Sequence, residues 1–331
     1  AMGGREVGGL ANQLACHMAI ENEQHRDLVQ RFWQSPFIAQ QAGFKAVDLF
    51  DAIEEGKIKA VWIMATNPAV SMPNANKVRN ALAKCDFVVV SDCMRNTDTT
   101  AFANVLLPSQ TWGERDGTVT NSERRISRQR AFLPSPGESR ADWWIISEVA
   151  KRLGYTNEFA YTEPADIFKE YATLSGFEND KTTTRDFDIS ALKDLSYTDY
   201  DDLQPVQWPV KESASGQARM FTDGKFNTQS GKAQFITIKN SLPALQTSDE
   251  YPLVLNTGRV RDHWHTMTRT GKSARLSGHI YEPYVEVHPD DANAFTIQDG
   301  GLAKVSSKHG EVVVRVKKTD SQRMGLSLIH I

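Results

Sequence analysis

The sequence predicts an α/β domain built on a parallel sheet, followed by a second domain made mainly of β-strands. Between residues 48 and 108, short apolar runs alternate with helical segments, which is the pattern of βαβ units. From residue 251 onward the pattern changes to short strands separated by glycine turns. These two observations give the fold class and the order of the domains.

The α/β region carries strand and helix signals in a regular order. The apolar runs at residues 60–65 and 87–90 are typical of buried parallel strands. Gly56 ends the helix before the first strand, and Asn74 or Asn76 caps the helix before the second. A third unit follows and closes at residue 108. Such alternation predicts right-handed crossover connections.

Residues 142–153 have the clearest helical pattern, with apolar side chains recurring every three or four positions. Gly154 follows as a left-handed terminating residue. Asp142 is expected to be the N-cap. After this helix the pattern weakens into polar stretches, with one hairpin predicted over 226–238 and a small barrel from residue 249. The predicted parts are an α/β domain (1–160), a connecting region (161–248), a barrel domain (249–325) and a tail (326–331).

Composition excludes several classes of protein. The chain has 331 residues, 40% hydrophobic and 24% charged, which is ordinary for about two globular domains. Its 38 basic and 41 acidic residues give a net charge of -3, so no general basic field favours nucleic acid or an anionic membrane. We find no apolar run long enough to span a membrane. The three cysteines form no CxxC pair, so reduced thiols are expected.

Polar residues that end the predicted parallel strands are the first candidates for a site, because ligands of open parallel sheets bind at that edge. Asn67 follows the first strand, and Ser91 and Asp92 end the second. A carboxylate there suits a ribose hydroxyl or the donor edge of guanine. Each residue is alternatively an ordinary turn former.

Residues 112–125 form a second candidate, a loop-like stretch with three arginines and two glycines. Glycines let backbone amides approach a ligand closely, and Arg115 could neutralise a phosphate. The alternative is a solvated face in which Glu114 and Glu123 pair with the arginines.

Residues 256–270 are the densest constellation. Thr257, Gly258 and Arg259 could form an anion-binding nest of backbone amides, to which Arg261 adds charge. His263 and His265 are two residues apart and could share a strand face. We interpret them as hydrogen-bonding groups for an anionic cofactor, since no third metal ligand is evident. A His-Asp dyad through Asp262 lacks a nucleophile. The residues alone thus predict a polyanionic ligand, with a nucleotide favoured, between the two domains.

At these motifs the chain resembles the catalytic subunits of assimilatory nitrate reductases, in the molybdopterin oxidoreductase family. The resemblance rests on ordered motifs: GREVGGLANQLACHM (4–18), ATNPAVSMPN (65–74), LLPSQTWGERDGTVTNSERR (106–125), PGESRADWW (136–144) and TGRVRDHWHTMTRTGK (257–272). It implies a Rossmann-like αβα domain followed by a truncated double-psi β-barrel domain. It also implies bis(molybdopterin guanine dinucleotide) as the molybdenum cofactor.

The resemblance assigns cofactor-binding positions and no catalytic residue or metal ligand. Arg115 stands where relatives often have Lys, and Asp142 gains a binding role beside its expected capping role. The implied cofactor-binding residues are Asn67, Ser91, Asp92, Arg115, Asp142, Thr257, Gly258, Arg259, Val260, Arg261, Asp262, His263, Trp264, His265 and Thr266.

The resemblance further implies a cytoplasmic enzyme that reduces nitrate to nitrite. Its electrons would come from ferredoxin, flavodoxin or an NADH-dependent reductase subunit, through a 4Fe-4S cluster. The family's cluster cysteines and molybdenum ligand precede the first residue of this chain, so we expect the chain to be an inactive fragment of the enzyme. We also expect the tail LSLIHI (326–331) to be foreign to the gene.

Two other families could carry the same motifs. A formate dehydrogenase, or another molybdenum enzyme acting on an oxyanion, would use the same cofactor. The large iron-sulfur subunit of respiratory NADH dehydrogenase keeps the fold as a scaffold without molybdenum. The intact TGRVRDHWHT run (257–266) argues against the scaffold, which needs no grip on a cofactor.

Overall fold

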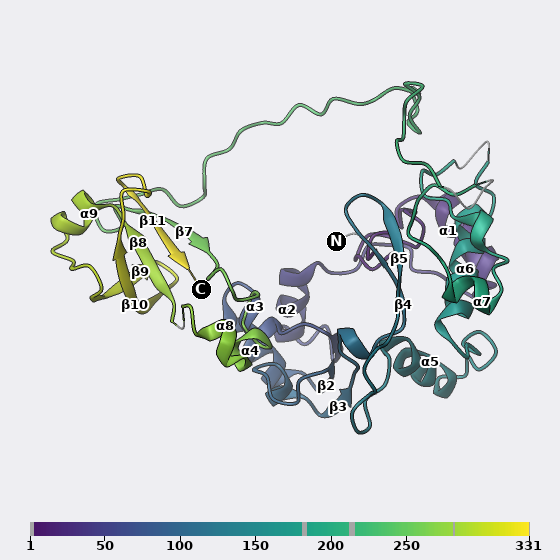
Figure 1. The fold of residues 1–331 in the computed structure, drawn as a ribbon, viewed down its shortest axis with the longest axis horizontal. Coiled ribbons are helices and arrows are strands. Elements are labelled where there is room, and N and C mark those ends of the chain that lie inside the picture. The colour runs from purple at the N-terminus through teal and green to yellow at the C-terminus, as the bar shows by residue number, and fades with distance from the viewer. Residues whose placement is uncertain (1–2, 181–183, 212–215, 281, 331) are drawn as a thin grey trace. The chain divides into compact units, whose positions relative to one another are not determined.

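A computed structural model describes residues 3–180, 184–211, 216–280 and 282–330. The chain divides into two compact units, each of which is described by itself (Figure 1). The units consist of Ala1–Ala52, Ser91–Cys93 and Val105–Ile236, and of Ile53–Val90, Met94–Asn104 and Thr237–Ile331. The division follows spatial contacts, so both units are assembled from segments far apart in the sequence.

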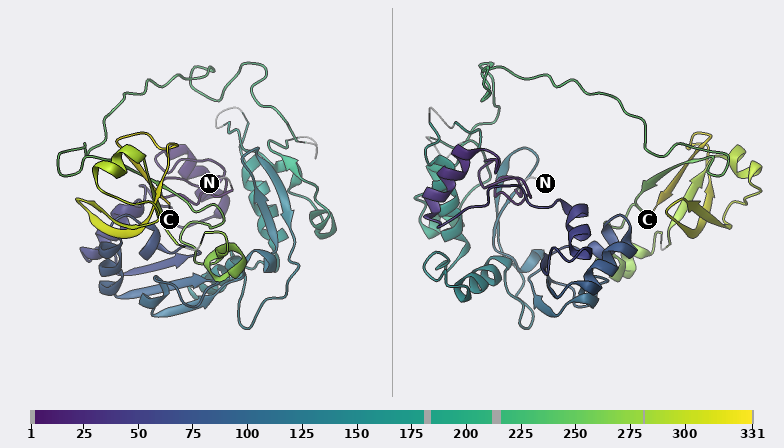
Figure 2. Two further views of the ribbon diagram at one scale, coloured as in Figure 1. Left: turned by 60° about the vertical axis from the view of Figure 1, so that its left-hand side comes forward. Right: turned by 180° about the vertical axis from the view of Figure 1, so that it is seen from behind.

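The predicted parallel sheet is confirmed, and its three strands lie in the order β1-β2-β3. Figure 2 shows this part of the chain, in blue, from two further sides. Gly56, with φ of 75°, follows the helix before β1, and Asn74 caps the helix before β2 by accepting a hydrogen bond from the Lys77 amide. The elements are α2 (Ala46–Glu54), β1 (Ala60–Met64), α3 (Pro68–Ser71), α4 (Ala75–Lys84), β2 (Phe87–Asp92), a 3-10 helix (Thr100–Phe102) and β3 (Val105–Pro108).

Helix α5 (Asp142–Arg152) is confirmed, but its predicted cap is wrong. The N-cap is Ala141, and no side chain caps this end, because Asp142 already lies inside the helix as its first residue. At the other end Gly154, with φ of 101°, donates to the Lys151 carbonyl, and the Tyr155 amide donates to that of Ala150. This pair of bonds is a Schellman termination. The Asp142 side chain therefore does not cap the helix.

The stretch predicted as a loop at 112–125 is largely a β-hairpin. After a 3-10 turn (Trp112–Glu114), β4 (Gly117–Thr120) pairs antiparallel with β5 (Arg125–Gln129), which also pairs with β6 (Val206–Gln207). Ile126 is the buried residue of β5, at 3% exposure. Because the strands carry mostly polar side chains, their alternation was too weak to predict them.

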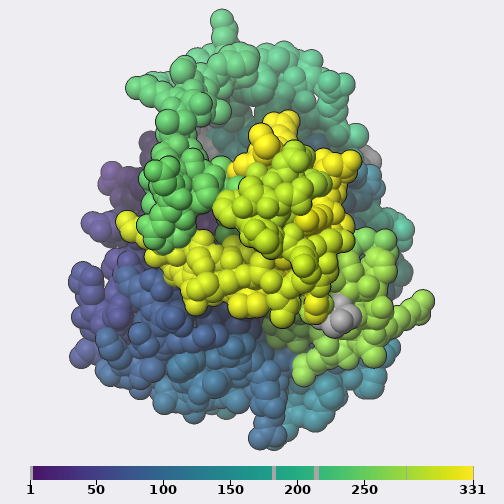
Figure 3. Space-filling view, turned by 90° about the vertical axis from the view of Figure 1, so that its left-hand side faces the viewer, coloured from purple at the N-terminus to yellow at the C-terminus, as the bar shows by residue number. Residues whose placement is uncertain are grey.

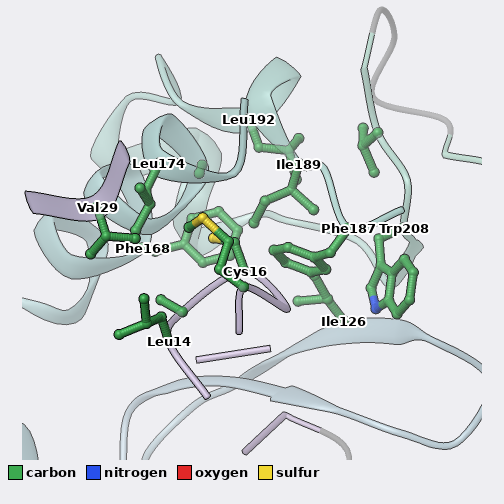
Figure 4. Close-up of a cluster of buried hydrophobic side chains, with 14 of the residues drawn as sticks. Leu14, Cys16, Val29, Ile126, Phe168, Leu174, Phe187, Ile189, Leu192 and Trp208 are labelled. Carbon is green, nitrogen blue, oxygen red and sulfur yellow. The ribbon is translucent and has the colours of Figure 1, made fainter. Parts of the chain in front are cut away.

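The main hydrophobic core of the first unit joins its amino-terminal residues to a region predicted as a connection. Phe187, at 1% exposure, lies 5.2 Å from the Tyr171 ring and 5.3 Å from the Trp208 ring (Figure 4). Residues between 164 and 180 and between 184 and 210 therefore contribute to a packed core, whereas we expected a connecting region from residue 161. The helices around it are α1 (Glu23–Trp33), α6 (Pro164–Gly176), a 3-10 helix (Ser190–Leu192) and α7 (Tyr197–Asp201).

The start of α6 gives a testable pH dependence. Burial opposes ionisation of Asp166, but hydrogen bonds from Thr162, Tyr197 and the Glu163 amide lower its pKa to about 2. A depressed folded-state pKa stabilises the fold above the unfolded value near 3.9 and is lost as pH falls toward about 2. We expect Asp166→Asn to lower the free energy of unfolding by about 1 kcal/mol at neutral pH, as other cap losses do. Urea titrations should show that this loss of unfolding free energy disappears near pH 2. The control is Asp194→Asn, at an exposed position, which should leave the free energy of unfolding unchanged at neutral pH.

The second unit ends in a curled five-stranded sheet with the order β7-β11-β8-β10-β9. Strands β9 and β10 form an antiparallel hairpin, with Val312 opposite Val305. In Figure 3 the atoms of these last strands are the yellow spheres. The elements are β7 (Val254–Gly258), a 3-10 helix (Thr270–Lys272), α8 (Ala274–Ser277), β8 (Tyr284–Val287), α9 (Pro289–Ala294), β9 (Leu302–Ser307), β10 (Gly310–Lys318) and β11 (Leu326–His330).

The hairpin predicted over 226–238 forms its turn but not its strands. The Phe226 amide donates to the Gly231 carbonyl at 3.1 Å, and no β-ladder continues from it in the described residues. Phe235 and Ile238 remain 99% and 89% exposed. Without a neighbouring face to bury them, the two segments gain nothing from pairing.

The tail forms strand β11, parallel to β7 and antiparallel to β8. Its alternating pattern buries Ser327 and Ile329, and Ile329 packs in the core of the sheet. The foreign origin of the tail stays a prediction.

None of the helices in the described ranges is long and apolar enough to cross a membrane. None of Cys16, Cys85 and Cys93 forms a disulfide bond in the described ranges.

Candidate functional site

Asn67 connects the end of β1 with the loop that follows β7. Its Oδ1 atom accepts hydrogen bonds from the amide and hydroxyl of Thr99, at 3.2 and 2.7 Å. Its Nδ2 atom donates to the Thr268 hydroxyl at 3.4 Å, and that hydroxyl lies 2.7 Å from the one of Thr266. Both ends of the amide are therefore used to hold two loops together. Sequence reasoning found Asn67 but missed Thr99 and Thr268, whose roles depend on tertiary contacts.

Ser91 and Asp92 are the last residues of β2, as predicted. Ser91 is fully buried, whereas Asp92 is half-buried. The Asp92 carbonyl accepts from the Ser109 amide at 3.1 Å, which fixes the backbone at this strand end. The strand thus presents an acidic side chain at its carboxyl end.

Arg115 and Asp142 are brought together by the turn after β3 and the first turn of α5. The Arg115 Nη2 atom lies 2.8 Å from Asp142 Oδ2, and its Nε atom donates to the Gln110 carbonyl at 2.8 Å. Asp142 Oδ1 is buried and has no hydrogen-bond partner in the described residues. A buried acceptor oxygen without a donor is costly unless a ligand supplies one.

For residues 112–125 the alternative was a solvated face of ion pairs, and the structure shows such a pair only at the end of this stretch. Arg125 and Glu123 form an exposed pair at 3.8 Å. Among the described residues Glu114 forms no ion pair with an arginine; it accepts from the Thr111 amide at 2.9 Å in a capping box. Arg115 instead meets Asp142.

The loop after β7 has a buried part that supports its shape. Thr257 and Gly258 end β7 and pair with β11, so the backbone nest predicted from residue 257 would begin inside this strand and stays a prediction. Val260 and His263 are 3% and 6% exposed, and His263 Nδ1 lies 3.2 Å from the Thr270 hydroxyl.

The two histidines do not share a strand face, contrary to one option from their spacing. The segment turns, and His265 has a left-handed backbone with φ of 45°, so the two side chains do not follow strand alternation. Across the described ranges, no three His, Cys, Asp or Glu side chains are grouped to hold a metal ion.

The exposed part of the loop is cationic and aromatic. The Arg259 guanidinium lies 4.9 Å from the centre of the Trp264 ring, and Trp264 is 64% exposed. The Trp264 and His265 rings meet edge to face at 4.3 Å. Together with Arg261 and Thr266, these side chains can donate hydrogen bonds to anionic oxygens and stack on a planar ring.

Asp262 pairs with a residue that the sequence did not indicate. Its Oδ2 atom lies 2.8 Å from His279 Nδ1, and its Oδ1 atom lies 3.2 Å from Arg261 Nε. Hydrogen bonds from Arg261 and His279 lower the pKa of Asp262. The histidine that pairs with Asp262 is thus His279, seventeen positions along the chain. No local spacing signal identifies such a pair.

Comparison with protein families gives two matches, in the same order as the two sets of residues above. Residues 3–152 match the family model "Molybdopterin oxidoreductase". Residues 253–330 match "Molydopterin dinucleotide binding domain". The first range contains Asn67, Asp92, Arg115 and Asp142, and the second contains the whole loop after β7.

The chain is similar to nitrate reductases and to a formate dehydrogenase subunit, and it spans less than half the length of each. A nitrate reductase of Klebsiella oxytoca is 50% identical over 98% of the chain, which spans 37% of that protein. The assimilatory nitrate reductase catalytic subunit of Bacillus subtilis is 35% identical over 99% of the chain and 45% of its own length. An F420-dependent formate dehydrogenase subunit alpha of Methanocaldococcus jannaschii is 32% identical over 98% of the chain, which spans 45% of that protein.

A similar solved structure supports the fold. Acetylene hydratase from Pelobacter acetylenicus superposes with a TM-score of 0.67 and 21% identity, covering 86% of this chain and 38% of the other. At this identity the likeness concerns the fold alone.

Proposed function

The chain belongs to the molybdopterin oxidoreductase family, and we propose that its residues hold the guanine dinucleotide parts of the molybdenum cofactor bis(molybdopterin guanine dinucleotide). The fifteen positions that the sequence resemblance assigns remain the proposed contacts. Asn67 and the loop 257–266 belong to one compact unit, while Ser91, Asp92, Arg115 and Asp142 belong to the other.

The buried Oδ1 atom of Asp142 is the observation that supports this proposal most directly. It is an acceptor without a protein donor, and Arg115 fixes the other oxygen of the same carboxylate at 2.8 Å. Guanine offers two neighbouring N–H donors on one edge, and a carboxylate is an acceptor only. The unpartnered acceptor oxygen therefore fits the N–H edge of a guanine base better than an adenine base.

The remaining residues fit the anionic and sugar parts of a dinucleotide. Arg259 and Arg261 supply charge for phosphate oxygens, and Asp92 suits a ribose hydroxyl. Asn67 holds the loop after β7 through Thr268. When bound, the cofactor supplies the molybdenum that takes an oxygen atom from the substrate. The protein residues described here bind and orient that group.

We propose that the parent enzyme is an assimilatory nitrate reductase located in the cytoplasm. The relatives at 50% and 35% identity support nitrate as its substrate. Its electron donor would be ferredoxin, flavodoxin or an NADH-dependent subunit, with a 4Fe-4S cluster in the part that this chain does not include. We expect the chain by itself to be inactive.

The test is to express the complete parent gene and measure molybdenum content and nitrate reduction with a viologen donor. We expect a loaded enzyme that produces nitrite, and we expect Asp92→Ala combined with Arg259→Ala to lower its molybdenum content. Parent protein without molybdenum would overturn the cofactor proposal. Loaded protein that ignores nitrate but oxidises formate would favour the second candidate, which the methanogen formate dehydrogenase at 32% identity supports.

A further inference from the structure

Asp262 lies in the loop after β7 and has a partner on each carboxylate oxygen. Arg261 Nε lies 3.2 Å from Oδ1, and His279 Nδ1 lies 2.8 Å from Oδ2. The Asp262 side chain is only 22% exposed, whereas those of Arg261 and His279 are 78% and 57% exposed. The acid is thus covered, and its two partners face solvent.

Both partners keep hydrogen-bond donors that the protein does not use. An arginine has five N–H donors, and only Nε of Arg261 is bonded within the described ranges. His279 uses Nδ1 for Asp262, and its Nε2 atom, which carries an N–H when the ring is doubly protonated, has no partner among the described residues. Because both side chains are anchored to one carboxylate, their unused donors are held near each other. Such fixed N–H groups match the oxygens of a phosphate.

We propose that Asp262 is a positioning residue, which holds Arg261 and His279 as a clamp for the phosphate oxygens of a guanosine diphosphate group. The inference rests on the proposed cofactor function of this loop and deepens it in two ways. It adds His279 to the residues that contact the ligand, and it removes Asp262 from them. A bare carboxylate would repel a phosphate, but here the negative charge is balanced by its two partners.

The test uses Asp262→Asn in the complete chain, with GDP as the probe and isothermal titration as the measurement. Removing a negative charge near an anion would by itself strengthen binding. Loss of the clamp has the opposite effect, and we expect roughly tenfold weaker GDP binding. Guanosine, which lacks phosphate, should bind the variant as it binds the original chain.

Matched variants separate positioning from general damage. Asp290 also lies near a histidine, His288, at 3.7 Å in the same unit, so Asp290→Asn is the control and should leave GDP binding unchanged. Asp262→Glu keeps the carboxylate and should restore most of the affinity.

His279→Asn tests the second half of the clamp. Its side-chain amide can still donate to Asp262, but it lacks the second ring N–H. We expect weaker GDP binding from this variant, and little further loss when Asp262→Asn is added, because the two residues act through one arrangement.

The outcomes distinguish this inference from the function on which it rests. If the original chain does not bind GDP, both are overturned. If it binds GDP and Asp262→Asn binds equally well or more tightly, the clamp is overturned and the cofactor function stands. Thermal unfolding measured by circular dichroism should show that each variant remains folded.

Discussion

Phe187→Ala is expected to lower the free energy of unfolding of the first unit by about 3–5 kcal/mol, the usual range for removing a buried phenylalanine. The side chain is 1% exposed and contacts the rings of Tyr171, Trp208 and His17, with centroids 5.2 to 5.6 Å away. These neighbours come from α6, from the segment after β6 and from the amino-terminal turns. A cavity at their meeting point removes contacts from all three at once.

The measurement is hydrogen exchange during urea denaturation of the complete chain, which separates the two units. Phe132→Ala is the control, since it deletes the same group from a side chain that is 73% exposed in the same unit. It should change stability by less than about 0.5 kcal/mol. Equal urea midpoints for the two variants would show that Phe187 does not anchor this core.

The Phe187 core also marks the limit of what the sequence predicts. The βαβ region follows from local periodicity, and its strands and caps appear close to the predicted residues. Helix α1 buries only Leu28 and Val29, so its pattern is weak, and its partners lie far along the chain. Arg31, for example, pairs with Glu178 at 2.6 Å. Periodicity describes one segment at a time and cannot identify which distant segment covers it.

In the candidate site, too, some residues can be predicted from sequence and others depend on tertiary contacts. The rule that ligands bind at the carboxyl ends of parallel strands identifies Asn67 and Asp92 from sequence alone. The contact of Arg115 with Asp142 cannot be derived, because it depends on how the turn after β3 meets α5. The unpartnered oxygen of Asp142 is likewise visible only when its surroundings are known. His279 carries no sequence signal, since its partner Asp262 lies on a different turn of the chain.

Asp142→Asn is expected to weaken GDP binding by the complete chain by about 10- to 100-fold, corresponding to about 1.5–3 kcal/mol for charge-assisted hydrogen bonds. Asparagine keeps the size of the side chain but replaces one acceptor oxygen by a donor NH₂ group. That group would face an N–H donor of guanine, or would break the 2.8 Å contact with Arg115. The proposal thus predicts a loss of preference for GDP over ADP as well as a loss of affinity.

Isothermal titration with GDP and ADP measures both effects. Asp48→Asn is the matched control, since Asp48 is also an acidic residue in the first turn of a helix, α2, but is exposed. It should bind both nucleotides as the original chain does. If Asp142→Asn keeps its preference for GDP, the unpartnered oxygen does not read the guanine edge, and Asp142 then serves only to hold Arg115. Arg115→Ala distinguishes that outcome further, because it would remove the held cation and leave the oxygen in place.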